Sequence, residues 1–160
     1  MLCFNFRYDF GISEEMGYRQ SMEDSCTILQ HMDISALAVH DLAPQSFFGV
    51  FDGHGGPNAS LYLSQQLHLN VGNALAAVSP ELRGYMDSIR DGTLNDSHPM
   101  KENVDKIVIE ALQSSFMKTD ADFVSTSPHS QNGSTATTAL VLGRRLYCAN
   151  TGDSRTFICR

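Results

Sequence analysis

The chain has 160 residues, of which 42% are hydrophobic and 18% charged, a balance that argues against wholesale disorder and predicts one globular domain. The net charge of -7 argues against a nucleic-acid partner, because gripping a phosphate backbone requires clustered Lys and Arg. No run approaches the ~20 apolar residues that span a membrane, and the start of the chain lacks the features of a signal peptide. We therefore expect a monomer of the cytoplasm, the nucleus or both, with no membrane contact.

The four cysteines are not arranged for metal binding. Cys3, Cys26, Cys148 and Cys159 include no C-x-x-C pair, so a structural zinc site is not indicated. Each lies in an apolar, strand-like stretch, which predicts buried free thiols in a reducing compartment.

Strands are predicted in the first part of the chain. Residues 4–12 alternate roughly, and 24–30 form a second strand candidate with Cys26 and Ile28 on one face. Residues 46–51 are an apolar run consistent with a buried strand that ends at Asp52. The glycine-rich stretch that follows predicts a turn, since regular elements tolerate glycine poorly.

Two helices are predicted next. Pro57 suits the first turn of a helix that extends to about Ala77, where leucines recur on one face. Residues 79–99 contain prolines, glycines and short polar side chains, and this composition predicts a loop. Residues 101–124 form the clearest helix, with one apolar stripe and polar residues opposite.

The last part of the chain again predicts strands. Residues 134–142 and 145–149 read as two strands joined by a hairpin turn at 143–144. A turn at 150–154 and the start of a further strand at 156–159 follow. Strands, then helices, then strands predict an α+β fold with antiparallel sheets.

The strongest chemical signal lies at the end of the third predicted strand. Asp52 is followed by a glycine-rich turn that contains His54. A carboxylate is a hard oxygen donor suited to Mg²⁺ or Mn²⁺, and a histidine can donate a proton near neutral pH. The alternative is a tight strand-to-helix turn in which Asp52 accepts backbone N–H bonds.

Two weaker clusters flank this signal. Glu23 and Asp24 precede the second predicted strand, with Arg19 upstream. The acids could orient metal-bound water and the arginine could hold a phosphate, or Arg19 and Glu23 could form a surface ion pair. Asp153 lies in the 150–154 turn as a further cation ligand or as a capping acid.

Four segments in order resemble the metal-dependent serine/threonine protein phosphatases of type 2C (the PPM family). They are G-Y-R-x-x-M-E-D at 17–24, F-F-G-V-F-D-G-H-G-G at 47–56, G-S-T-A at 133–136 and N-x-G-D-S-R at 150–155. The D-G-H-G-G core is specific, and the similarity covers essentially the whole chain. The resemblance implies an antiparallel β-sandwich flanked by helices, in α-β-β-α layers, with residues 1–160 as its N-terminal portion.

The resemblance also implies a reaction. Such enzymes hydrolyse phosphoserine and phosphothreonine in proteins by means of a water that bridges two Mg²⁺ or Mn²⁺ ions. Asp52 would bridge the ions and the Gly53 carbonyl would bind one of them. Glu23 and Asp24 would act through metal-bound waters, and Asp153 would help to form a third metal site.

Two further residues take catalytic roles in this resemblance. Arg19 would hold the phosphate, and His54 would protonate the departing alkoxide. No cysteine or serine nucleophile is implied, and the Gly133–Thr135 segment is interpreted as a strand start near the core.

The chain departs from the family in one respect. The family carries further metal-binding aspartates downstream, in an Asp-Gly and an Asp-Asn motif, and nothing after Arg155 supplies them. Asp87, Asp91 and Asp96 lie too early in the order to replace them. We therefore expect an incomplete metal site and two readings: a phosphatase given in part, or a truncated phosphatase-like module that binds partners or phosphoproteins without turnover.

Overall fold

A four-stranded antiparallel sheet is the centre of the structure, a computed structural model that describes residues 9–37, 42–91, 101–128 and 131–159. The strand order is β1-β2-β5-β6. These strands comprise β1 (Ser25–Leu29), β2 (Gln45–Phe51), β5 (Ala136–Leu142) and β6 (Arg145–Thr151). Two-residue strands β3 (Gly53–His54) and β4 (Gly133–Ser134) pair beside it.

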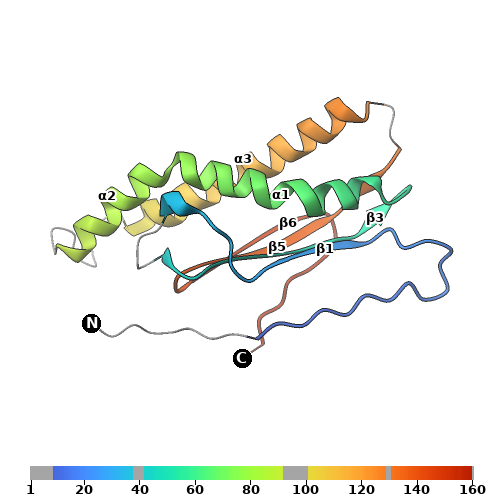
Figure 1. The fold of residues 1–160 in the computed structure, drawn as a ribbon, viewed down its shortest axis with the longest axis horizontal. Helices are drawn as coiled ribbons and strands as arrows, with labels where there is room; N and C mark the ends of the chain where they lie inside the picture. The colour runs from blue at the N-terminus through green and yellow to red at the C-terminus, as the bar shows by residue number, and fades with distance from the viewer. Residues whose placement is uncertain (1–8, 38–41, 92–100, 129–130, 160) are drawn as a thin grey trace.

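Three helices form a layer on one face of this sheet, as Figure 1 shows. They are α1 (Asn58–Ala77), α2 (Ser79–Arg90) and α3 (Lys101–Thr126), and a 3-10 turn, η1 (Ser35–Leu37), lies beside them. The α+β class and the antiparallel pairing predicted from the sequence are therefore confirmed. Within the described ranges the chain provides one helical layer and one four-stranded sheet.

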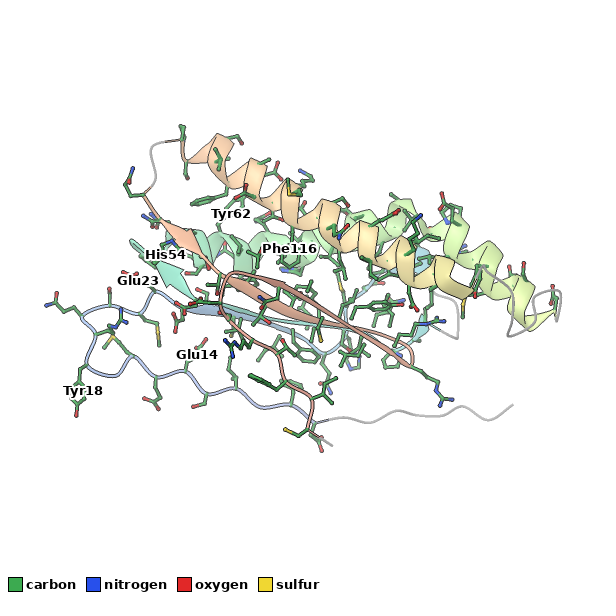
Figure 2. All side chains as sticks on the ribbon, turned by 180° about the vertical axis from the view of Figure 1, so that it is seen from behind. Glu14, Tyr18, Glu23, His54, Tyr62 and Phe116 are labelled. Atoms are coloured by element: carbon green, nitrogen blue, oxygen red, sulfur yellow. The ribbon has the colours of Figure 1, made fainter. Side chains whose placement is uncertain are left out.

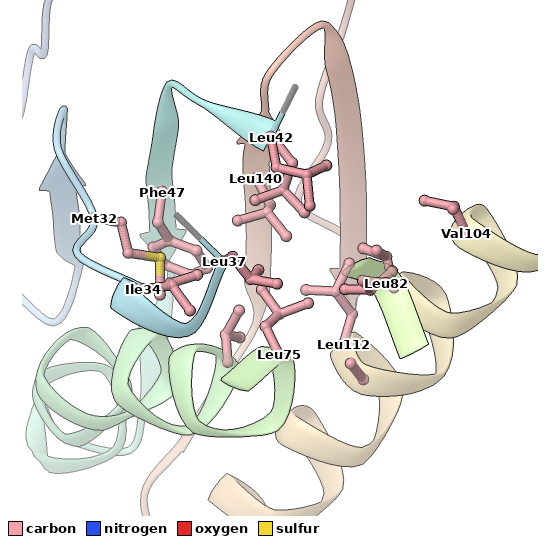
Figure 3. Close-up of a cluster of buried hydrophobic side chains, with 14 of the residues drawn as sticks. Met32, Ile34, Leu37, Leu42, Phe47, Leu75, Leu82, Val104, Leu112 and Leu140 are labelled. Atoms are coloured by element: carbon pink, nitrogen blue, oxygen red, sulfur yellow. The ribbon is translucent and has the colours of Figure 1, made fainter. Parts of the chain in front are cut away.

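Alternation along the strands builds the core between these two layers. Phe47 and Phe51 of β2 and Leu140 of β5 are fully buried. They share one core cluster with a stripe on α1 that includes Val71 and Leu75, spaced four residues apart so that both face the sheet. Figure 3 shows Phe47, Leu75 and Leu140 in this cluster. The helical layer is thus fixed to the sheet by apolar packing, which positions the loops at the strand ends.

The opposite face of the sheet is also apolar. Val50 is 51% exposed and Leu146 is 48% exposed on this side. The irregular N-terminal segment lies against part of it, where the rings of Phe10 and Phe48 are 5.7 Å apart. We call this surface, which also carries Cys26 and Cys148, the outer sheet face.

The loop predicted at 79–99 is wrong for its first part, since Ser79–Arg90 is helix α2. Pro80 lies in the first helical turn, where no backbone N–H is needed. Leu82, Tyr85 and Met86, at helical spacing, are buried in the core. The loop prediction rested on the prolines and glycines of this stretch and overlooked its amphipathic pattern. Residues 92–99, including Asp96, lie outside the described residues.

Other predictions at the chain ends are also corrected. Residues 9–12 and 156–159 are irregular and exposed, so neither forms the predicted strand, and residues 1–8 lie outside the described ranges. Phe157 and Ile158 are 76% and 70% exposed, and among the described residues no strand pairs with them. Cys148 and Cys159 are free and exposed rather than buried, because β6 is an edge strand and residue 159 follows the sheet.

The remaining elements agree closely with the sequence. Helix α1 ends at Ala77 as predicted, and α3 runs two residues beyond the predicted end. The hairpin at 143–144 joins β5 to β6, which extends to Thr151. The stretch 53–56 is not only a turn, because Gly53 and His54 pair with β4. In the described part of the chain, no helix has both the length and the apolar character needed to cross a membrane.

Candidate functional site

The pairing of β1 with β2 brings the first two acidic segments to one edge of the sheet. Ser25 pairs with Phe51 in antiparallel register. Asp24 and Asp52 are the next residues beyond this pair, so each continues its strand at the same end. Both are exposed, whereas the adjacent Glu23 is partly buried.

A close backbone contact locks this edge. A Cβ on Gly53 would overlap the carbonyl oxygen of Glu23 and lie 3.1 Å from its carbonyl carbon. The Ser60 hydroxyl, fully buried on α1, donates to the same Glu23 oxygen. Only glycine allows the two main chains to approach so closely, so the glycine after Asp52 sets the distance between the two acidic segments.

The backbone of Asp52 is held from the other side by Ser134 and Thr135, at the end of β4 and just before β5. Its N–H donates to Thr135 Oγ1 at 3.2 Å, and its carbonyl accepts the Thr135 N–H at 2.8 Å. The Ser134 hydroxyl also donates to the Asp52 carbonyl, at 3.2 Å. The carboxylate accepts no hydrogen bond from the residues described, so the capping alternative for Asp52 is not seen.

The turn that contains Asp153 packs against the same threonine. Thr135 Oγ1 lies 2.6 Å from Ser154 Oγ. A Cβ on Gly152, which has a φ of +89°, would lie only 2.8 Å from Thr135 Cγ2. Asp153 itself is exposed. Thr135 therefore links the backbone of Asp52 to the turn that carries Asp153.

His54 is fixed by the short strand pair. It pairs with Gly133 in the β3–β4 register, and a Cβ on Gly133 would lie 2.7 Å from His54 Cε1. The imidazole therefore rests on the bare backbone of Gly133. Figure 2 shows His54 and Glu23 at the same end of the sheet.

The glycine turn after His54 is held by Asn132. Its side-chain Nδ2 donates to the Gly55 carbonyl at 2.8 Å, and its Oδ1 accepts the N–H of Asn58 at 3.0 Å. A Cβ on Gly56, with a φ of +123°, would meet the same amide oxygen at 2.7 Å. One asparagine side chain thus fixes the strand-to-helix turn and the start of α1.

Arg19 is not brought to the acids by any contact among the described residues. It follows a turn at Gly17, with φ of +61°, in which the Arg19 N–H donates to the Met16 carbonyl at 3.3 Å. The whole stretch 9–21 is exposed, and the neighbouring Tyr18 projects away from Glu23 and His54 (Figure 2). Within this part of the chain, Arg19 and Glu23 form no salt bridge either.

The residues missed by sequence reasoning are the small polar ones that hold the backbone. Ser60, Asn132 and Ser154 lie inside or beside the motifs but carry no charge, and only their folded contacts reveal their role. Thr135 was interpreted only as part of a strand start near the core, and its position between β4 and β5 agrees with that reading.

The oxygen donors at this edge suit a hard divalent cation in kind. Asp52, Asp24 and Glu23 offer carboxylates, which Mg²⁺ and Mn²⁺ prefer, and the exposed Asp52 and Asp24 are free to bind. In number they fall short, since no three His, Cys, Asp or Glu side chains in the described ranges gather as a metal-binding group. That these carboxylates bind a cation therefore stays a prediction.

Comparison with known proteins agrees with this geometry. A family model described as protein phosphatase 2C matches residues 8–160. Probable protein phosphatase 2C 56 of Oryza sativa subsp. japonica is 38% identical over 152 residues, which cover 93% of this chain and 34% of that protein. Protein phosphatase 2C homolog 2 of Schizosaccharomyces pombe is 36% identical over 155 residues, which cover 94% and 34%.

The chain spans about a third of the length of these curated relatives. A solved structure described as a C. elegans sex determining protein aligns with a TM-score of 0.46 and 20% identity, over 78% of this chain and 24% of that one, too distant to support an argument. The family model, in contrast, covers nearly every residue. This chain belongs to the protein phosphatase 2C family.

Proposed function

We propose that this chain supplies the N-terminal part of the active site of a metal-dependent protein serine/threonine phosphatase. The observation that carries the proposal is the β1–β2 register, which brings Glu23, Asp24 and Asp52 to one edge of the sheet. Family membership supports phosphorylated proteins as the substrate class. Phosphate monoesters hydrolyse extremely slowly unaided, so such an edge must supply a very large rate enhancement.

Asp52 and the Gly53 carbonyl would hold Mg²⁺ or Mn²⁺, with Glu23 and Asp24 beside them and Asp153 contributing to a further ion. When bound, such ions lower the pKa of water from ~15.7 toward neutrality and neutralise phosphoryl oxygens. The chain's own contribution is to fix Asp52, because both its N–H and its carbonyl are hydrogen-bonded to Thr135. Rigidly held ligands are what a binding site of this kind requires.

His54 is the proton donor in this proposal. Its ring is held against Gly133 and exposed to solvent, so it can hold a proton at the position where an alkoxide leaves. Arg19 would bind the phosphate by its planar fork. It lies in an exposed segment, and no contact among the described residues joins it to Asp52.

A second candidate is a phosphatase-like module that binds without turnover. It is favoured by the finding that the described residues gather no three-donor metal group. Ligand charge and number set the affinity of a hard cation, so a partial donor set binds the metal weakly. Binding of metal and hydrolysis must therefore be measured separately.

The test compares the chain with Asp52→Asn in two assays. We expect weak Mn²⁺ binding, measured by calorimetry or electron paramagnetic resonance, that falls at least about tenfold in Asp52→Asn, with little hydrolysis of a phosphothreonine peptide by either protein. Glu81→Gln, which neutralises an exposed acid on α2, is the matched control and should bind as the parent does. Equal Mn²⁺ affinity in the parent and Asp52→Asn would refute the proposed site, and robust turnover lost in Asp52→Asn would favour the enzyme over the module.

A further inference from the structure

An apolar groove opens between α1, the C-terminal half of α3 and the β4–β5 edge. Its volume is about 410 Å³, within the range of small ligand pockets. Leu63 and Leu67 of α1 and Phe116 of α3 line it, and Leu67 is almost completely buried. We call it the α1–α3 groove.

Large apolar side chains are exposed to solvent at the mouth of the groove. Met117 is 72% exposed and Val124 is 56% exposed, and both line the groove. Clustered apolar exposure at a concave site is typical of a surface that binds a partner.

The walls of the groove are fixed before anything binds. Asn70 Nδ2 donates to Thr119 Oγ1 at 2.9 Å and joins α1 to α3 at one end. The rings of Tyr62 and Phe123 lie 5.4 Å apart and join the same helices nearer the strand edge. Figure 2 shows Tyr62 and Phe116 between the two helices. A preformed groove of this kind loses little ordering entropy when an occupant enters.

The groove is continuous with the candidate phosphatase site. Asn132 and Ser134 line its wall. The same two side chains hold the active-site turn, since Asn132 donates to the Gly55 carbonyl at 2.8 Å and Ser134 donates to the Asp52 carbonyl at 3.2 Å. An occupant of the groove therefore lies one residue from the backbone that carries Asp52.

The charge at the mouth of the groove favours an occupant with a basic residue. Asp120 lines the mouth, is exposed, and has no ion-pair partner among the residues described. Its neighbour Asp122 differs, because it pairs with Lys118 at 2.6 Å. An uncompensated carboxylate beside an apolar groove, in a chain of net charge -7, complements a basic residue next to an apolar one.

We propose that the α1–α3 groove is a substrate-docking site that takes an apolar side chain of the phosphoprotein, flanked by a basic residue that faces Asp120. The proposal rests on the proposed function, because it places the groove beside the phosphate site. The chain would therefore prefer substrates that carry this apolar residue and this basic residue near the phosphorylated residue.

The experiment measures binding of fluorescent phosphothreonine peptides to the whole chain in the presence of Mn²⁺. A leucine–arginine pair is placed in turn at each position on either side of the phosphothreonine in an otherwise Ala/Ser peptide. We expect one narrow set of positions to bind at least about tenfold more tightly, since burying one leucine side chain is worth at least that factor. No positional preference would overturn the proposal.

Two variants locate the effect. Met117→Asp should remove the leucine-dependent gain. Ile109→Asp is the matched control because Ile109 is an exposed apolar residue of the same helix, 46% exposed and outside the groove, and it should keep the gain. Asp120→Lys should lower affinity for the arginine peptide and restore it when glutamate replaces arginine. Circular dichroism checks that each variant folds, and loss of the gain in both aspartate variants would overturn the assignment.

The design separates docking from the phosphate site. Asp52→Asn should remove only the part of the peptide affinity that depends on the phosphate. The gain in affinity due to leucine should remain, and unphosphorylated peptides should show it too. A phosphate gain without a leucine gain would overturn docking and leave the proposed function standing. Self-association abolished by Met117→Asp would identify a second copy of the chain as the occupant, and it would also overturn the proposal.

Discussion

Replacing Gly53 by alanine tests the contact on which the candidate site depends. The new methyl group would overlap the Glu23 carbonyl oxygen and lie 2.9 Å from Ser60 Oγ. Neither neighbour can rotate away, because the first is main chain beside β1 and the second is a fully buried hydroxyl bound to that same carbonyl. The two acidic segments must therefore separate.

The expected cost follows from what has to move. Overpacking a well-fitted interior costs ~1–3 kcal/mol and sometimes more, and a clash with the Glu23 main chain and with the buried Ser60 hydroxyl belongs at the upper end. Part of the Ser60–Glu23 hydrogen bond, worth about 1 kcal/mol, is lost as well. We expect Gly53→Ala to lower the free energy of unfolding by about 3 kcal/mol, or the urea midpoint by roughly 1.5 M at a typical slope.

The assay is urea unfolding followed by circular dichroism, with Gly84→Ala as the matched control. Gly84 lies inside α2, where an added Cβ meets nothing within 4 Å, so alanine should raise stability by about 0.5–1 kcal/mol. The two substitutions should therefore have opposite signs. An unchanged midpoint for Gly53→Ala would refute the reasoning that this glycine sets the approach of β3 to the Glu23 segment.

Two further outcomes follow from the outer sheet face and from β6. Val50→Lys should raise the concentration up to which the isolated chain remains monomeric in sedimentation, because it places a charge on an apolar sheet face. Leu69 is also 51% exposed but lies on α1, so Leu69→Lys should leave that concentration unchanged. The Tyr147 hydroxyl donates to Asp105 at 2.7 Å. The pKa of this phenol is raised, mainly by burial and secondly by the hydrogen bond to Asp105. Since a raised pKa stabilises the fold only while the phenol is protonated, the free energy of unfolding should fall above about pH 10, and Tyr147→Phe should reduce that loss; an equal fall in both proteins would contradict this assignment.

The sequence predicted the elements whose periodicity is long and regular. Helix α1 and helix α3 repeat an apolar face over several turns, and β2 and β5 are apolar runs between clear turns. Helix α2 was missed because of Pro80 and Gly84, although Pro80 lies in the first turn, where a helix tolerates it, and Gly84 costs only about 0.5–1 kcal/mol in the interior. Residues 156–159 were predicted as a strand from their composition, but a strand also needs a partner.

The candidate site shows a similar division. The sequence predicts Asp52, Glu23 and Asp24 as cation ligands, which stays a prediction, and the strand register brings their segments together. The pattern did not reveal Ser60 or Thr135, because a hydroxyl that holds a backbone looks like any other serine or threonine in a sequence. Only the fold shows which carbonyl each one reaches.

The contacts of each acid distinguish a candidate metal ligand from a carboxylate that forms an ion pair on the surface. The Asp52 main chain is bound through both its N–H and its carbonyl, yet its carboxylate accepts nothing from the described residues. Asp122 shows the reverse, since its carboxylate is committed to Lys118 on an exposed helix surface, where such pairs contribute little. A fixed backbone with an uncommitted carboxylate is the arrangement that leaves an oxygen donor free for a cation without loss of position. Asp24 and Asp153 are also exposed and, within the described ranges, their carboxylates accept no hydrogen bond, so they are the next acids to neutralise if Asp52→Asn weakens Mn²⁺ binding.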